Sequence, residues 1–311
     1  VIVPVNTFIA TALAVSITGA TPVFVDCDEH YNININEIEK KITPKTKAII
    51  PVHLFGQPAE LDPIMEFAEK YKLRILSDSC ECMFVHYKGK PIGSYGDISC
   101  FSTYVAHLLV TGVGGLSCTS DPELAAIMRS LVNHGRDGIY FSIDDDAGKT
   151  GAELAEIVSK RFSFERLGYS YRITELEAAL GCAQLESYSE MLTKRRLNAL
   201  YLTMGLMKFE ELQLPWHPEY IEHAFMMYPI VLWDKPKTAL VNFLEERGIE
   251  TRDMLPLINQ PYWIERFGDT SWSYPNAEWV NTSGFYLGCH QGMTEESLDY
   301  IIQTISQFFE E

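Results

Sequence analysis

The sequence predicts an α/β protein built on a mainly parallel sheet, and two features of the chain support this. Short apolar runs typical of buried strands alternate with helical patterns through the first half of the 311 residues. Hydrophobic residues make up 47% of the chain, which is enough for a large core and for two domains. Alternating strands and helices favour a parallel sheet with helices on both faces.

The expected elements of the first half follow one another regularly. Strands are expected at 1–3, 22–25, 48–52, 74–76, 98–102 and 115–119, and helices at 10–17, 35–41 and about 58–71. A further helix should begin at Asp121-Pro122, because aspartate caps helices and proline suits the first turn. Residues 142–163 are expected to form a polar surface loop with a short helix around 152–160. Its acidic run, Asp144-Asp145-Asp146, should be solvated.

The second half predicts fewer, longer elements. One long helix is expected from Thr174, a candidate cap, past Arg196. A strand at 224–233, a helix at 238–247 and a C-terminal helix at 296–309 follow. We therefore expect a large α/β domain in residues 1–190 and a smaller domain in residues 191–311.

Charge and cysteine content exclude several classes of function. The net charge of −17 disfavours binding to nucleic acid or to anionic membranes. No apolar run is long enough to span a bilayer and no basic leader precedes the first strand, so we expect a cytoplasmic protein. Seven scattered cysteines indicate reduced thiols. Cys80-Glu81-Cys82 is a weak metal signal, and we expect its thiols to pack in the core.

Three polar residues near strand ends are candidates for chemistry. Asp78 follows a buried strand at the edge where open α/β sheets bind ligands, and a carboxylate there can keep a pyridine nitrogen protonated. Ser102 ends another strand and can contact a phosphate, although such a serine is also a common turn residue. His107 suits a general base or acid. The alternatives, an aspartate that caps a loop and a structural histidine, stay open at this point.

Other residues carry weaker signals. Gly112, Gly114 and Gly115 allow a tight loop. From the sequence alone, Phe8 belongs to the core. Two arginines, Arg136 and Arg252, could hold a diphosphate or could simply be solvated. The histidines at 53, 134 and 290 are equally compatible with structural roles.

Short motifs along nearly the whole chain resemble, in order, signatures of the DegT–StrS family of sugar-nucleotide aminotransferases. They lie at 1–11, 51–58, 77–81, 101–115, 133–137, 168–175, 248–252 and 287–290. The resemblance implies a fold-type-I, aspartate aminotransferase-like large domain and a smaller α+β C-terminal domain. Because the chain opens within a strand, we expect the family's N-terminal segment, with its phosphate-binding Ser-Gly-Thr turn, to be absent.

The resemblance also implies roles for the cofactor-binding residues, the cofactor being pyridoxal phosphate or pyridoxamine phosphate. Phe8 would stack on the cofactor ring and Asp78 would bind its pyridinium nitrogen. Glu81 stands in place of a glutamine near the ring hydroxyl, and Ser102 matches a phosphate-binding serine. Ser170 replaces an asparagine that reaches a phosphate in the neighbouring subunit, which implies a homodimer.

Four residues in family signatures would contact the nucleotide-sugar substrate. They are His134, Arg136, Arg252 and His290. The family's context is polysaccharide biosynthesis, including the lipopolysaccharide O-antigen.

Two departures from the family pattern bear on the reaction. His107 occupies the position of the lysine that forms the Schiff base, and Val113 replaces a glutamate. The chain thereby resembles a branch of sugar 3-dehydratases that hold pyridoxamine phosphate without a covalent bond. In that branch the histidine is a base, the substrate is a 4-keto-6-deoxy sugar nucleotide, and glutamate can regenerate the amine. No cysteine lies between Arg136 and Gly168, so we expect no iron–sulfur cluster.

Two alternatives remain open. The chain could be a sugar-nucleotide aminotransferase, with glutamate as amino donor and a displaced lysine such as Lys88, Lys90 or Lys149. It could also be a decayed family member with a regulatory or partner role, because Val113, Ser170 and the lost lysine all depart from the pattern.

Overall fold

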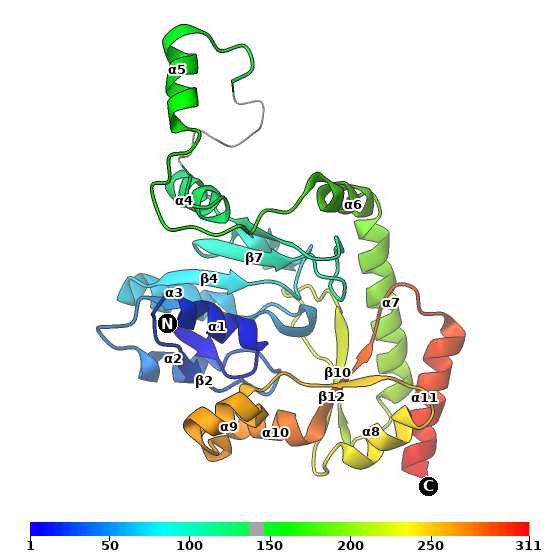
Figure 1. Ribbon diagram of the computed structural model, residues 1–311. Coiled ribbons are helices and arrows are strands. Elements are labelled where there is room, and N and C mark those ends of the chain that lie inside the picture. The colour runs from blue at the N-terminus through cyan, green and yellow to red at the C-terminus, as the bar shows by residue number, and fades with distance from the viewer. Residues whose placement is uncertain (137–145, 311) are drawn as a thin grey trace.

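The computed structural model describes residues 1–136 and 146–310, and its centre is a six-stranded sheet (Figure 1). The strand order is β2-β1-β3-β4-β7-β8, and every neighbouring pair is parallel except β7 and β8. The strands are β1 (Ile2–Pro4), β2 (Val23–Val25), β3 (Ala48–Ile49), β4 (Arg74–Asp78), β7 (Ile98–Ser102) and β8 (Gly115–Cys118). The carboxyl ends of β3, β4 and β7 therefore share one edge of the sheet.

Helices connect these strands and cover the sheet. The helices of the first half are α1 (Ile9–Ile17), α2 (Ile35–Lys41), α3 (Leu61–Tyr71), α4 (Pro122–Val132) and α5 (Gly151–Lys160). A small hairpin of β5 (His86–Tyr87) and β6 (Lys90–Pro91) follows β4. Helices α2 and α3 cover an apolar core that includes Ile38, Ile64 and Ile75. The α/β class predicted from strand and helix alternation is thus confirmed.

Most expected boundaries agree with the structure to within a few residues. Asp121 caps α4 as predicted, because its carboxylate accepts from the backbone N–H groups of Glu123 and Leu124. The expected strand 48–52 is shorter, since only Ala48–Ile49 are strand and Val52 adds an isolated bridge to Asp78. Helix α5 extends away from the rest of the chain in Figure 1. Residues 142–145 of the expected acidic loop, and Asp137 of the 133–137 motif, lie outside the described residues.

The long helix expected from residue 175 is two helices, and this expectation was wrong. Helix α6 (Glu175–Leu185) ends before α7 (Tyr188–Leu206) begins. At the break, the Ser187 backbone N–H and hydroxyl both bond the Gln184 carbonyl, at 3.1 and 3.3 Å. Serine competes in this way for helix carbonyls and favours a turn. Thr174 precedes α6 as the expected cap, and its backbone N–H donates to the Glu177 side chain at 2.8 Å.

The last third forms a second, antiparallel sheet with the order β11-β12-β10-β9. Its strands are β9 (Leu212–Gln213), β10 (Met227–Leu232), β11 (Thr251–Asp253) and β12 (Gly284–Gly288). The other helices of this part are α8 (Thr238–Glu245), α9 (Pro261–Phe267), α10 (Pro275–Ser283) and α11 (Glu295–Glu310). Helices α7 and α11 run side by side against this sheet (Figure 1). We propose the domain boundary near residue 190, so that residues 1–190 and 191–311 form the two domains.

The two sheets share an apolar core, and a polar clamp lies beside it. Val5, Tyr31 and Phe55 from the first part pack in the same cluster as Leu257 and Trp263 from the second. Next to this cluster, the Asp26 carboxylate at the end of β2 accepts from the first N–H groups of α10. These bonds come from Asn276 at 3.0 Å and Ala277 at 2.9 Å. A carboxylate at a helix N-terminus satisfies otherwise unpaired donors.

Two further findings concern the described part of the chain only. None of the helices within residues 1–136 and 146–310 combines the length and apolar character needed to cross a membrane. Within the same ranges, no three histidine, cysteine, aspartate or glutamate side chains converge so as to hold a metal ion.

Candidate functional site

The Asp78 carboxylate lies at the carboxyl end of β4, where its neighbour β7 also ends. Its Oδ2 accepts a hydrogen bond of 2.8 Å from the Thr11 hydroxyl, and its Oδ1 accepts one of 3.2 Å from the Cys80 N–H. Thr11 belongs to the first turn of α1, and Phe8 is the residue that precedes this helix. The Phe8 ring is 62% exposed. Helix α1 therefore brings an exposed aromatic ring and a fixed carboxylate to the same edge of the sheet, and Phe8 does not belong to the core.

Thr11 is a contact of Asp78 that sequence reasoning did not assign. Its hydroxyl also lies 2.9 Å from that of Thr7, and both side chains are buried. An ionised carboxylate can only accept, so Thr11 gives its proton to Asp78 and accepts from Thr7. The two hydroxyls thus form a relay that orients the carboxylate. Thr7 lies just before α1 and Thr11 lies in its first turn, and the sequence does not say which group they contact.

Glu81 lies where the two parts of the molecule meet. Its Oε2 accepts from the Phe55 N–H at 2.6 Å, and Phe55 has a left-handed backbone with φ of 57°. The Phe55 ring lies 5.6 Å from that of Tyr286 on β12. Burial raises the pKa of Glu81 to about 7, against an opposing effect of the Phe55 N–H, and the nearby negative charge of Asp78 adds to the rise. Glu81 can therefore carry a proton at neutral pH.

Ser102 ends β7 and faces the glycine loop. Its hydroxyl oxygen accepts from the Tyr104 N–H at 3.2 Å, and within the described ranges its own proton has no acceptor. Ser102 pairs with Gly115 across β7 and β8. A side chain at Gly115 would come within 2.8 Å of the Phe101 carbonyl oxygen. The glycine at 115 therefore lets β8 approach β7 closely, and the Ser102 hydroxyl is left able to donate to an anion.

His107 follows this strand and is half-buried. Its Nδ1 is buried and has no hydrogen-bond partner among the residues that the structure describes. The ring stands edge-on to Tyr104, with ring centroids 6.0 Å apart. Burial lowers the pKa of His107 below its ordinary 6.5, while the charge of Asp78 and the Ser102 backbone act in the opposite direction. The imidazole is accordingly neutral at pH 7 and can accept a proton.

These five residues form one group, called here the candidate cofactor site. Its members are Phe8, Asp78, Glu81, Ser102 and His107. The structure connects them through the Thr11 bond, the charge interactions of Asp78 and the pairing of β4 with β7.

A second group of predicted residues joins segments 133–136 and 170–172. The Arg172 guanidinium bonds the His134 ring at 3.1 Å and the Ser170 hydroxyl at 3.4 Å. Asn133 forms a backbone bridge with Ser170. The Arg136 guanidinium lies over the rings of Phe162 and Phe164, at 5.2 and 5.8 Å from their centroids. The structure thus brings His134 and Ser170 together and places Arg136 in the neighbouring turn.

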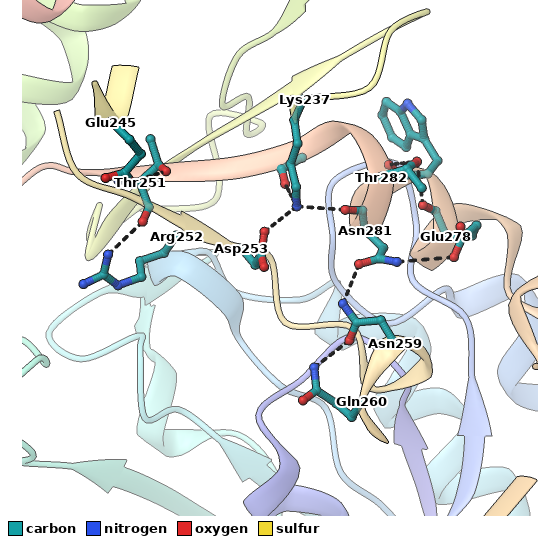
Figure 2. Close-up of polar contacts among 12 residues, drawn as sticks. Lys237, Glu245, Thr251, Arg252, Asp253, Asn259, Gln260, Glu278, Asn281 and Thr282 are labelled. Carbon is teal, nitrogen blue, oxygen red and sulfur yellow. Dashed lines mark hydrogen bonds and ion pairs between the residues drawn. The ribbon is translucent and has the colours of Figure 1, made fainter. Parts of the chain in front are cut away.

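The two remaining predicted residues belong to the second sheet. Arg252 on β11 is exposed and donates to the Thr251 carbonyl at 2.8 Å (Figure 2). It also pairs with Glu250. His290 follows β12, and its Nδ1 accepts from the Gly292 N–H at 3.1 Å. His290 and His107 line the same cavity, of about 1240 Å³. His290 therefore lines a cavity together with His107 of the candidate cofactor site, whereas Arg252 does not line that cavity.

Figure 2 also shows how the strand that carries Arg252 is held. The Lys237 ammonium donates at 2.8 Å to the carbonyls of Asn281 and Gly284 and pairs with Asp253 at 2.6 Å. The Asn281 side chain in turn accepts from Asn259 at 2.5 Å. These contacts join β11 to the end of α10 and fix the part of the second sheet nearest to Arg252.

None of the lysines considered as alternatives lies at the candidate cofactor site. Lys88 pairs with Asp62 and lies over the Tyr220 ring. Lys90 is exposed on β6, and Lys149 pairs with Glu153 at 2.6 Å. Within the described ranges, no contact joins any of the three to Asp78, Ser102 or His107.

The five residues of the candidate cofactor site supply groups that pyridoxal phosphate or pyridoxamine phosphate requires, but none of the five is a lysine. Asp78 offers a carboxylate for a protonated ring nitrogen, and Phe8 offers an exposed aromatic face. The Ser102 hydroxyl has a proton for a phosphate oxygen. Within residues 1–136 and 146–310, the Nδ1 of His107 has no hydrogen-bond partner. The donor and acceptor chemistry of these residues therefore fits the group.

The fold and this site together define the fold-type-I class of pyridoxal-phosphate enzymes. Residues 1–306 match the model of the DegT/DnrJ/EryC1/StrS aminotransferase family. The chain belongs to that family.

The names of three relatives of this chain describe different activities. The lipopolysaccharide biosynthesis protein RfbH of Salmonella typhimurium is 34% identical over 94% of this chain and 69% of its own length. The GDP-perosamine synthase of Caulobacter vibrioides is 34% identical over 99% of this chain and 78% of its own length. The dTDP-4-dehydro-2,6-dideoxy-D-glucose 3-dehydratase of Saccharopolyspora spinosa is 30% identical over 93% and 65%.

Solved structures share the fold of this chain over nearly its whole length. GDP-4-keto-6-deoxymannose-3-dehydratase (ColD), crystallised as a histidine-to-asparagine mutant with bound GDP-perosamine, has a TM-score of 0.86 and 25% identity. It is matched over 98% of this chain and 79% of its own. An aminotransferase from Psychrobacter cryohalolentis has a TM-score of 0.88 and 25% identity, over 99% and 80%. The family thus contains both aminotransferases and dehydratases.

Proposed function

We propose that this chain is a pyridoxamine-phosphate-dependent dehydratase that removes the 3-hydroxyl group of a 4-keto-6-deoxy sugar nucleotide. The observation that carries the proposal is His107, a neutral half-buried imidazole at the position where the family has its Schiff-base lysine. Two relatives named as sugar 3-dehydratases support the reaction class. We expect the cofactor to be bound without a covalent bond and no iron–sulfur cluster to be present.

Each member of the candidate cofactor site would have one task. When bound, pyridoxamine phosphate supplies an amine for the substrate ketone and a ring that withdraws electrons. Asp78, oriented by Thr11, would hold the proton on the ring nitrogen. Phe8 would cover one ring face, and Ser102 would donate to the phosphate. Glu81, with a pKa of about 7, would share a proton with the ring hydroxyl.

His107 would move the proton that starts elimination. Its neutral ring would take the proton from the cofactor carbon C4′ as the 3-hydroxyl leaves the sugar. A base works best when its pKa is near the working pH and its basic form is populated. The lowered pKa of His107 keeps it unprotonated at pH 7.

The remaining predicted residues would serve the substrate and the partner subunit. His134, Arg136, Arg252 and His290 would contact the nucleotide sugar. Ser170 would reach a phosphate across a homodimer interface. The apolar side chains of Leu167 and Leu176, which are 92% and 79% exposed, lie on the same segment as Ser170 and suit such an interface. We further propose glutamate as the amino donor, a cytoplasmic location and a role in polysaccharide biosynthesis.

Transamination is the second candidate function. The aminotransferase from Psychrobacter cryohalolentis favours it, because it shares the fold over nearly the whole chain. A decayed member with a partner role is the third, and Val113 and Ser170 favour it.

One experiment separates the candidates. The protein would be loaded with pyridoxal phosphate and reduced with borohydride, and the adduct would be mapped by mass spectrometry. We expect bound but unattached cofactor and dehydration of a 4-keto sugar nucleotide. A modified lysine would instead establish transamination, and failure to bind either cofactor form would favour the decayed member.

A further inference from the structure

Arg195 is a buried cation whose hydrogen-bond partners in the described part of the chain are all neutral. Its side chain leaves α7 toward the interior and only 5% of the residue is exposed. Its Nε donates to the Gln291 side chain at 3.1 Å, and its Nη1 donates to the carbonyls of Phe225 and Met226 at 3.3 and 3.0 Å. No carboxylate of residues 1–136 or 146–310 pairs with it. Burial lowers its pKa, yet arginine stays protonated in proteins.

The guanidinium has one amino group left over, and a cavity adjoins it. The Nη2 group donates to no acceptor within the part of the chain that the structure describes. Arg195 lines the cavity of about 1240 Å³ that also holds His107. The other guanidinium nitrogens donate to neutral acceptors. A buried charge is costly unless it is well paired, so a guanidinium with a free Nη2 at a cavity wall points to an anionic ligand.

Neighbouring groups in the cavity are also hydrogen-bond donors. Gln291 uses its oxygen to accept from Arg195, which leaves its amide nitrogen for the cavity. The His290 Nδ1 accepts from Gly292, so a neutral ring carries its proton on Nε2. Lys194 lines the same wall. Among the described lining residues the only carboxylate is that of Glu190, which is exposed on the first turn of α7.

We infer that this cavity binds an oxyanion, a carboxylate or a phosphate, with the Arg195 guanidinium as its anchor. The inference rests on the proposed function, because that reaction brings two oxyanion carriers to His107. One is the diphosphate of the nucleotide sugar and the other is a carboxylate of glutamate. Arginine suits either, because the free Nη2 group offers two N–H donors and its positive charge complements both groups.

The test uses the full chain loaded with pyridoxamine phosphate and two probes, inorganic pyrophosphate and L-glutamate. Binding of each is measured by titration calorimetry in Arg195→Met and Arg196→Met. Arg196 is a matched control, because it donates from the same helix to the His223 carbonyl at 3.0 Å but pairs with Glu222 and does not line the cavity. Both variants lose carbonyl contacts, and only Arg195→Met loses the cavity cation.

We expect at least one probe to bind Arg195→Met ten-fold or more weakly than wild type, and to bind Arg196→Met within two-fold of wild type. A loss with pyrophosphate identifies the nucleotide diphosphate as the ligand group, and a loss with glutamate identifies the amino donor. The inference would be overturned if the two variants lost equal affinity or if neither lost affinity. It would also be overturned if wild type bound neither probe.

Two further variants keep the test decisive if Arg195→Met does not fold. Arg195→Lys retains the charge and should bind the probe within a few-fold of wild type. Gln291→Leu removes a donor at the cavity wall and should weaken binding, and unchanged binding there contradicts the inference. The binding assay involves no turnover. If His107→Asn still dehydrates substrate, the proposed function fails while the oxyanion measurement keeps its meaning.

Discussion

The Thr11 hydroxyl donates a 2.8 Å hydrogen bond to Asp78 Oδ2, which ties the first helix of the chain to the central carboxylate of the candidate site. Because Oδ1 is occupied by the Cys80 N–H, both oxygens are oriented before any ligand arrives. Preorganised groups lose little freedom on binding, and this is how supporting contacts improve a site.

Thr11→Val should weaken cofactor binding without unfolding the protein. Valine keeps the shape but removes the donor to Asp78 and the acceptor for Thr7. A hydrogen bond to a charged group contributes about 1.5 kcal/mol, so we expect roughly ten-fold weaker binding of pyridoxamine phosphate. Fluorescence titration measures this. Thr282→Val, at a helical threonine bonded to the Glu278 carbonyl, is the control and should bind normally. Equal affinities in the two variants would falsify the relay.

His107→Asn should abolish dehydration and leave cofactor binding nearly intact. Removal of a general base lowers the rate by about 10² to 10⁴-fold. In wild type the pKa of His107 is lowered, so its basic form is present at neutral pH and is lost only as the pH falls below its ordinary value of 6.5. Loss of the His107 base should therefore lower kcat/KM only below pH 6.5. The profile is measured in Glu81→Gln, where residue 81 does not titrate, and a fall that begins above pH 7 in this variant would contradict the base role.

Glu81→Gln should remove a pH dependence of stability. The folded pKa of Glu81 is about 7 and its ordinary value is 4.5, so the folded state binds the proton more tightly than the unfolded state. Stability from this group is then full below about pH 4.5 and is lost as the pH rises through 7. Glutamine does not titrate. Urea unfolding at pH 5 and 8.5 should show wild type losing about 2 kcal/mol more than the variant. If wild type and variant lost the same unfolding free energy between pH 5 and 8.5, Glu81 would be ionised throughout this range.

Gly135→Ala should disrupt the turn that carries His134 and Arg136. Gly135 has φ of 81°, and a Cβ there would lie 1.8 Å from the Arg166 carbonyl oxygen. Gly148 has φ of 74° with nothing near its Cβ position. We expect Gly148→Ala to cost about 1 kcal/mol from backbone strain alone, and Gly135→Ala to cost several-fold more. Chemical denaturation of both variants measures the difference. Similar costs would mean that the turn yields readily.

The sequence could predict the α/β class and most strands, because the apolar runs and the Asp121 cap are local signals. It could not predict the break at Ser187, where one side chain competes for a helix carbonyl. For the site, Asp78, Ser102 and His107 were identified from strand ends and from the family motifs. Thr11 and Arg195 were not, because their partners lie 67 and up to 96 residues away and only the folded chain brings them together.

The clamp at Asp26 has a consequence for how the protein is made. Its carboxylate is 2% exposed, and its partners in α10 lie 250 and 251 residues further along the chain. A ribosome adds about 5 to 20 residues each second, so this carboxylate waits more than ten seconds for those donors. Until α10 emerges, the layer around Val5 and Tyr31 lacks its cover. The nascent chain is then a natural client for a chaperone that shields apolar surface, and its first half expressed alone should aggregate.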